Sequence, residues 1–219
     1  MDSMSYILFI CVAAPVLLML VPIDSKSRKV ILFLLTGMFC CLLVSEINGL
    51  LLRVSDLGHF YFTTNVTPIT EEIIKVLPVL YFALVFSKDR KELVTAAFSV
   101  GVGFAILENL IILTQNYESV NIMFAVARGF SSGLMHSICT MFVAFFISFA
   151  KKNKKIFIIG TVSSLNLSIT YHSVFNLLVQ SDYTAARVIG LLLPFICYAL
   201  INAFSVIKEK QKSGTKKAE

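Results

Sequence analysis

Long runs of apolar residues alternate with short polar gaps along almost the whole chain. Each run has about 20 residues, the length at which a helix crosses ~30 Å of hydrocarbon. The runs are continuously apolar, whereas the strands of a membrane barrel alternate apolar and polar residues. We therefore predict an all-α, polytopic transmembrane bundle with seven spans: Tyr6–Ile23, Val30–Leu52, Val66–Phe86, Leu93–Thr114, Ile122–Ala150, Ile156–Val179 and Val188–Ile207.

The composition excludes a soluble domain. The chain is 57% hydrophobic and 15% charged, whereas soluble domains are roughly 45–50% apolar and 25% charged. The five cysteines all lie inside apolar runs without CxxC spacing, which excludes a disulfide framework or a zinc finger. We expect residues 1–219 to form a single integral membrane domain embedded in the lipid bilayer.

The basic residues predict how the chain is oriented. Of the 19 Lys and Arg residues, 15 lie in the gaps after the first, third and fifth spans or after the seventh, and only Arg53 and Arg187 lie in gaps on the other side. Because cytoplasmic loops are rich in Lys and Arg, the N-terminus is predicted outside and the C-terminus in the cytoplasm. The net charge of +6 thus reflects topology and not nucleic-acid binding. Residues 53–65 form the longest external loop, and residues 208–219 form a basic cytoplasmic tail that we expect to be disordered.

Polar residues interrupt several of the apolar runs. A charge at the centre of a membrane helix costs about 2.5–3.5 kcal/mol on insertion scales, so such residues are functional candidates by default. The residues in question are Glu71, Glu72, Lys75, Glu108, Asn109, Arg128, His136, His172 and Asn176.

The depths of five of these residues agree. Glu108 and His172 lie seven and eight residues before the outer ends of their spans, which is roughly 10–12 Å. Counting about 20 residues back from the inner ends of the third and fifth spans puts Glu71, Glu72 and His136 roughly 6–8 Å below the outer surface. Four helices thus deliver carboxylates and imidazoles to one layer, which predicts a shared site near the outer face.

Helical spacing adds expectations about pairing. Glu71 and Lys75 are four residues apart and can pair on one helix face, as His172 and Asn176 can on another. Glu72 faces about 100° away from Glu71, so we expect only one of the two carboxylates to be central. Small residues, which permit close helix approach, surround these positions: Gly101, Gly103, Gly129, Ser131, Ser132 and Gly133.

The residue types of this layer fit hydrolysis in two ways. A carboxylate such as Glu71 can take a proton from water, while His172 and Asn176 stabilise an oxyanion. Alternatively, a zinc ion with a water ligand can be held by Glu71, Glu108, His136 and His172. The residues alone leave both mechanisms open.

Four motifs in this layer resemble those of the PrsW family of intramembrane proteases. Glu71–Lys75 (EEIIK) matches the family's EExxK motif, and Phe104–Asn109 (FAILEN) matches FxxxE. His136 is similar to the family's lone histidine in the next helix, and His172–Asn176 (HSVFN) resembles HxxxN. The motifs occur in family order on separate spans, so the resemblance covers about residues 66–180, the expected catalytic core.

The resemblance implies an intramembrane endopeptidase of the cell membrane. Its substrate would be a membrane-anchored protein cut near the extracytoplasmic face, as characterised relatives cut an anti-sigma factor. The implied catalytic residues are Glu71, Glu72, Glu108, His136, His172 and Asn176, with Lys75 as a charge partner. The metalloprotease-like description of the family favours Zn²⁺.

Other functions and residue roles are weighed beside this one. A proton-coupled small transporter also uses buried Glu, His and Lys, but its paired repeats are not found in the sequence. A CAAX-type prenyl protease is similar in kind, but that family carries EExxxR and FxxxH motifs, which argues against a prenylated substrate.

We interpret Arg128 as an interfacial anchor that extends outward, Glu46 and Asn48 as packing residues, and His59 as incidental.

Overall fold

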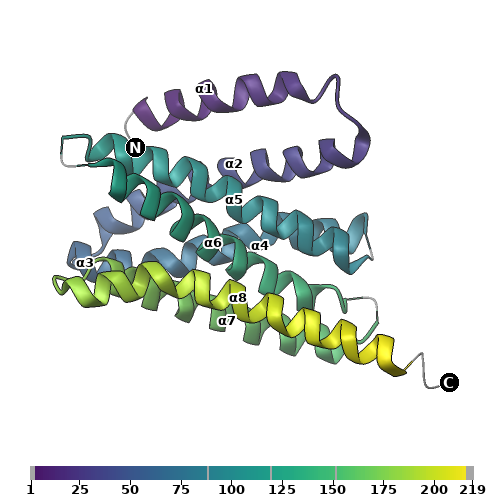
Figure 1. Cartoon of the computed structure of the whole chain (residues 1–219). Coiled ribbons are helices and arrows are strands. Elements are labelled where there is room, and N and C mark those ends of the chain that lie inside the picture. The colour runs from purple at the N-terminus through teal and green to yellow at the C-terminus, as the bar shows by residue number, and fades with distance from the viewer. Residues whose placement is uncertain (1–2, 88, 119, 151, 216–219) are drawn as a thin grey trace.

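The computed structural model describes residues 3–87, 89–118, 120–150 and 152–215, and every regular element in these ranges is helical. The long helices run side by side and form a bundle (Figure 1). The elements are α1 (Ser3–Met19), α2 (Ser25–Val54), α3 (His59–Tyr61), the π-helix η1 (Phe62–Val66), α4 (Thr67–Val85), α5 (Arg90–Gln115), α6 (Ile122–Ile147), α7 (Lys154–Val179) and α8 (Thr184–Thr215).

A long helix lies at each of the seven predicted spans. By length and composition, α2, α5, α6 and residues Thr184–Ala203 of α8 are apolar enough to cross a membrane. The helix α4 is shorter and carries Glu71, Glu72 and Lys75. The helical fold class is therefore confirmed, while the number of spans and the orientation stay predictions.

Two predicted irregular segments are helical. The loop predicted at 53–65 contains α3 and η1, and the π-helix η1 leads directly into α4. Short π-helical segments are rare and frequently occur at functional sites. The predicted disordered tail was wrong in part, because α8 continues to Thr215; residues 216–219, with Lys216 and Lys217, lie outside the described residues, as do Lys88 and Lys151.

Short polar side chains set where four of the helices begin. Asp24 accepts hydrogen bonds from the backbone N–H groups of residues 26 and 27 at the start of α2. Asp89, Asn121 and Asn153 cap α5, α6 and α7 in the same way. Such caps satisfy backbone donors that the first helical turn leaves without partners. Each polar gap read from the sequence thus also supplies the start of the next helix.

Glycines bring α5 into backbone contact with the helices on either side. A Cβ added at Gly103 would lie 1.9 Å from the carbonyl oxygen of Leu34 in α2, and one added at Gly101 would lie 2.5 Å from the Cα of Ser137 in α6. These two positions confirm the expected close approach. Gly129 and Gly133 do not, because an added Cβ would meet nothing within 4 Å at either position.

We expect labelling from outside the cell to confirm the predicted orientation. Tyr117 and Lys152 are exposed at opposite ends of α5 and α6, and neither caps a helix. A membrane-impermeant maleimide should label Tyr117→Cys in intact cells and should label Lys152→Cys only after permeabilisation. Both variants are made in a chain that lacks the native cysteines, because Cys11 is exposed, and that chain without an added cysteine is the control. The opposite pattern would overturn the orientation.

Candidate functional site

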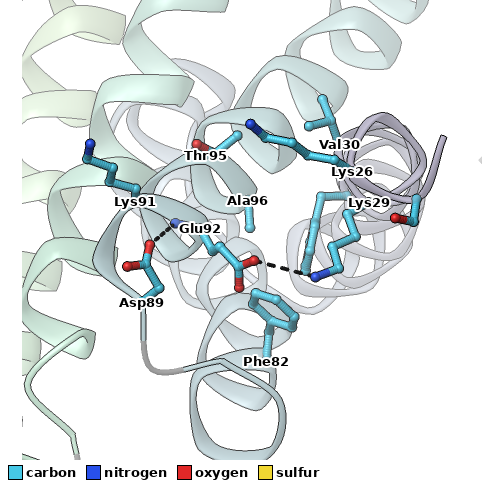
Figure 2. A pocket seen from close by; sticks show the side chains of 11 residues that line it. Lys26, Lys29, Val30, Phe82, Asp89, Lys91, Glu92, Thr95 and Ala96 are labelled. Carbon is cyan, nitrogen blue, oxygen red and sulfur yellow. Dashed lines mark hydrogen bonds and ion pairs between the residues drawn. The ribbon is translucent and has the colours of Figure 1, made fainter.

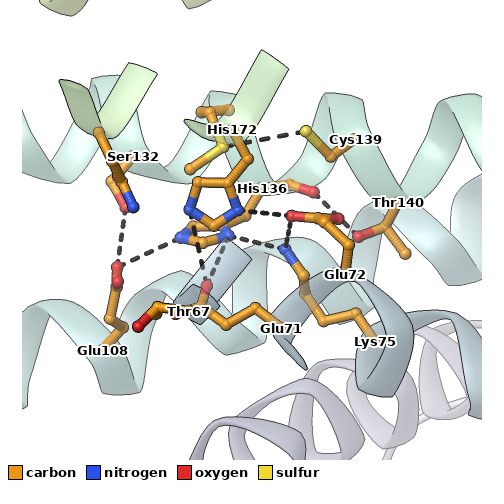
Figure 3. Close-up of polar contacts among 12 residues, drawn as sticks. Thr67, Glu71, Glu72, Lys75, Glu108, Ser132, His136, Cys139, Thr140 and His172 are labelled. Atoms are coloured by element: carbon orange, nitrogen blue, oxygen red, sulfur yellow. Dashed lines mark hydrogen bonds and ion pairs between the residues drawn. The ribbon is translucent and has the colours of Figure 1, made fainter. Parts of the chain in front are cut away.

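Four helices bring the predicted polar residues together in the interior of the bundle (Figure 3). Glu71, Glu72 and Lys75 come from α4, Glu108 from α5, His136 from α6 and His172 from α7. Apart from Glu108, which is partly exposed, all are buried. We call these six residues the polar cluster.

Glu72 lies at the centre of one half of the cluster. Its Oε1 atom accepts hydrogen bonds from Lys75 Nζ and from His172 Nδ1, each at 2.7 Å. The expected ion pair between Lys75 and Glu71 is therefore replaced by one with Glu72, three residues away. Lys75 Nζ also lies 2.8 Å from His136 Nδ1, where the ammonium group donates to the ring nitrogen.

Both glutamates of α4 reach the cluster, although they face different atoms of it. Glu71 Oε2 lies 3.7 Å from His172 Nε2, while Glu72 bonds Nδ1 of the same ring. An imidazole carries its two nitrogens on different edges. A single ring can therefore bridge two carboxylates that leave α4 in directions about 100° apart.

Glu108 organises the other half of the cluster. Its Oε2 atom lies 3.2 Å from His136 Nε2, from the Ser132 hydroxyl and from a guanidinium nitrogen of Arg128. Arg128 thus turns toward Glu108 instead of acting as the outward anchor that we expected. Arg128 and Ser132 are site residues that the motifs do not contain.

Asn176 lies outside these contacts. Its Nδ2 atom donates to the backbone oxygen of Thr63 in η1 at 3.1 Å. The Thr63 hydroxyl in turn donates to Gln180 Oε1 at 2.9 Å. Asn176 therefore links the π-helix η1 to α7 through a hydrogen bond. His172, one turn earlier, contacts the carboxylates of Glu71 and Glu72.

The two imidazoles turn their inner nitrogens toward the same carboxylate. The carboxylates of Glu72 and Glu108 bind the outer nitrogens of His172 and His136, which places a proton on each of those nitrogens. The inner atoms, His172 Nε2 and His136 Nδ1, lie 3.7 and 3.9 Å from Glu71 Oε2. Such carboxylate–histidine pairs are the usual outer support of zinc ligands.

These atoms fit a metal ion. One ligand atom each from Glu71, His136 and His172 lies within 4.8 Å of the other two. Glu71 Oε2 is buried and has no hydrogen-bond partner among the described residues. An unpaired buried carboxylate is costly, and a divalent cation would supply its missing partner. Three protein ligands and one open position are the usual set of a catalytic zinc site.

The charges of the cluster also favour a bound cation. Three carboxylates face two fixed cations, Lys75 and Arg128, so one negative charge is left over when the imidazoles are neutral. Lys75 donates to the same lone pair of His136 that a metal ion would use. Metal binding at that nitrogen and this hydrogen bond therefore exclude each other, and Glu72 remains as a partner for Lys75.

Two cavities of the bundle differ in whether they reach the polar cluster. A cavity of about 330 Å³ is lined by Glu71 and Glu108. A larger pocket of about 640 Å³ lies between the N-terminal ends of α2 and α5 (Figure 2). Its acids have structural partners, because Asp89 caps α5 and Glu92 pairs with Lys29. The smaller cavity is therefore the one that reaches reactive groups.

Two further sequence interpretations concern α2. The side chain of Glu46 accepts a hydrogen bond from the Tyr6 hydroxyl, which links α1 to α2. Asn48 Oδ1 accepts one from Thr70 at 2.7 Å, which links α2 to α4. Both contacts join neighbouring helices, as packing residues do.

The family model described as PrsW family intramembrane metalloprotease matches residues 26–207 of the chain. The match runs from α2 into α8 and includes every residue of the polar cluster, while α1 lies before it. Comparison with curated proteins and with solved structures gives no match.

Proposed function

Because the chain belongs to the PrsW family of intramembrane metalloproteases, we propose that it hydrolyses a peptide bond of a membrane-anchored protein near the extracytoplasmic face of the cell membrane. The observation that carries the proposal is the convergence of His136 Nδ1 and His172 Nε2 on the unpaired Glu71 oxygen. We propose seven spans, with the cluster below the outer surface. An anchored anti-sigma factor is the substrate that the family resemblance suggests.

We propose Glu71, His136 and His172 as the ligands of a zinc ion. Zinc bound there supplies Lewis acidity, which polarises a peptide carbonyl and lowers the pKa of a bound water toward ~7. Glu72 and Glu108 hold the two histidines in the tautomer that leaves the inner nitrogens without a proton. Lys75 balances the charge of Glu72 in the dry interior.

Glu108 is the carboxylate best placed to exchange protons with the cavity. Its side chain is 21% exposed, against 5% for Glu71 and 0% for Glu72. We propose that Glu108 accepts a proton from the attacking water as the water oxygen bonds to the peptide carbon. The same proton then passes to the amide nitrogen as the peptide C–N bond breaks, leaving a carboxylic acid and an amine.

Mapping new protein termini tests this function in cells. We expect membranes that contain the wild-type chain to hold a new terminus at the extracytoplasmic end of a spanning segment in another protein. Membranes with the Glu71→Gln chain, at the same abundance, should lack it. Identical termini in both samples, or a cut only on the cytoplasmic side, would contradict the proposal.

A further inference from the structure

Two cavities adjoin each other beside the first turns of α2. The pocket of about 640 Å³ between the N-terminal ends of α2 and α5 is lined in part by Lys29, Phe33 and Phe82 (Figure 2). The same three residues line a second cavity of about 440 Å³, between α2 and α4. The rings of Phe33 and Phe82 pack edge to face, with their centres 4.9 Å apart. We call the first cavity the basic pocket and the second the apolar groove.

The basic pocket carries more positive charge than its own acids balance. Lys26, Lys29 and Lys91 line it, together with Asp89 and Glu92. Asp89 accepts a hydrogen bond from the backbone of α5. Lys29 and Glu92 are 3.5 Å apart and exposed, and such pairs are weak. Lys26 and Lys91 are also exposed and pair with no acidic side chain among the described residues (Figure 2). These ammonium groups can therefore bind an anion.

The apolar groove follows the same helices away from the basic pocket. In α2 it extends from Lys29 to Thr36, seven residues or roughly 10 Å along the helix axis. On the α4 side it extends from Phe86 back to Pro78, eight residues or roughly 12 Å. Between these ends the lining side chains are apolar or aromatic. The groove thus runs along the helices from a charged end, as a lipid acyl chain runs from its headgroup into a bilayer.

The predicted orientation puts the basic pocket at the cytoplasmic side of the membrane. The cytoplasmic leaflet is the one that carries anionic lipids, and basic pockets between membrane helices on that side bind their headgroups. A free phosphate ion would use the basic pocket alone. The continuity of the pocket with the groove instead matches a molecule that has both a phosphate group and an acyl chain.

We propose that the basic pocket and the apolar groove form a binding site for one anionic phospholipid. Its phosphate group lies among Lys26, Lys29 and Lys91, and one of its acyl chains lies in the groove between α2 and α4. The site shares no residue with the polar cluster, and the proposal does not depend on the proposed proteolytic function.

Native mass spectrometry of the purified full-length chain in detergent tests this site. The probes are dioleoyl phosphatidylglycerol, dioleoyl phosphatidylcholine and glycerol phosphate. We expect wild type to retain one phosphatidylglycerol molecule at a concentration at which phosphatidylcholine, with the same acyl chains, is not retained. Glycerol phosphate, which has no acyl chain, should not displace the lipid at that concentration. Equal retention of the two lipids, or displacement by glycerol phosphate, would overturn the proposal.

The double variant Lys26→Gln, Lys91→Gln tests the assignment of the basic pocket. It removes two unpaired cations and leaves the pair of Lys29 with Glu92 in place. A basic residue near an anionic membrane surface contributes about 1 kcal/mol, which is roughly fivefold in Kd. We therefore expect the Kd for phosphatidylglycerol, measured by titration, to rise by roughly 25-fold. An unchanged Kd would remove the two lysines from the site.

Lys154→Gln, Lys155→Gln is the matched control. It removes two exposed lysines from the first turn of α7, predicted on the same side of the membrane, and neither lines the pocket or the groove. It should bind phosphatidylglycerol like wild type. Equal weakening in both double variants would show attraction by the overall charge of this face, and the proposed site would be wrong. Thermal unfolding without added lipid should be the same in both variants, since all four lysines are exposed.

Discussion

Replacing Glu71 with glutamine is expected to abolish cleavage while the protein still accumulates in the membrane. The change keeps the shape of the side chain but removes the carboxylate on which the two inner imidazole nitrogens converge. Loss of a metal ligand removes several kcal/mol of transition-state stabilisation. At 1.36 kcal/mol for each factor of ten, cleavage should fall by about 10³-fold or more.

Glu72→Gln is the control for Glu71→Gln, because it changes a neighbouring buried carboxylate that is not a proposed metal ligand. Glu72 supports His172 and does not face the inner nitrogens. Changing such an outer partner typically costs about 10–100-fold in metal affinity or activity. Kinetics of both variants on one membrane-protein substrate measure the difference. Equal loss in the two variants would place Glu71 outside the ligand set, and full activity of Glu71→Gln would remove it from the chemistry.

Replacing Lys75 with methionine is expected to cause the largest loss of stability. Its ammonium group pairs with Glu72 at 2.7 Å, and both side chains are fully buried. Removing one partner of a buried ion pair leaves the other charge unpaired and typically costs about 3–5 kcal/mol. Denaturant unfolding of the metal-free protein in detergent should show a decrease of this size in the free energy of unfolding.

Two variants serve as controls for Lys75→Met. Lys29→Met breaks an exposed pair with Glu92 at 3.5 Å (Figure 2), and exposed pairs contribute only about 0–1 kcal/mol. The double variant Glu72→Gln, Lys75→Met should lose less stability than the sum of its single changes, since it leaves no buried charge unpaired. A Lys75→Met protein as stable as Lys29→Met would show that the buried pair of Lys75 and Glu72 does not stabilise the fold.

The sequence predicts the helices and the shared level of the polar residues along them because both depend on regular geometry. A fixed rise per residue places Glu108 and His172 at comparable distances from the ends of their helices. No such rule says which side chains bond each other. Lys75 pairs with Glu72 and not with Glu71. The pairing depends on how α6 and α7 pack against α4, since His172 of α7 also bonds Glu72.

Two other residues show where local spacing loses its predictive value. Arg128 lies near the N-terminal end of α6, yet its long side chain reaches into the bundle to Glu108. Asn176 shares a helix face with His172, but it bonds the Thr63 carbonyl in a π-helix. The pattern of residues 62–66 contains no signal for a π-helix, so neither that element nor its partner could be read from the sequence.

The zinc content of the purified protein tests the central claim most directly. The chain has three histidines, which provide ligand variants and a matched control. We expect stoichiometric zinc in wild type and in His59→Ala, because His59 is exposed and is not one of the proposed ligands. Zinc should be lost in His136→Ala and His172→Ala, and chelation of wild type should stop cleavage. A metal-free wild-type protein that cleaves at an undiminished rate would contradict the metal site and would leave Glu71 as the base of a metal-free mechanism.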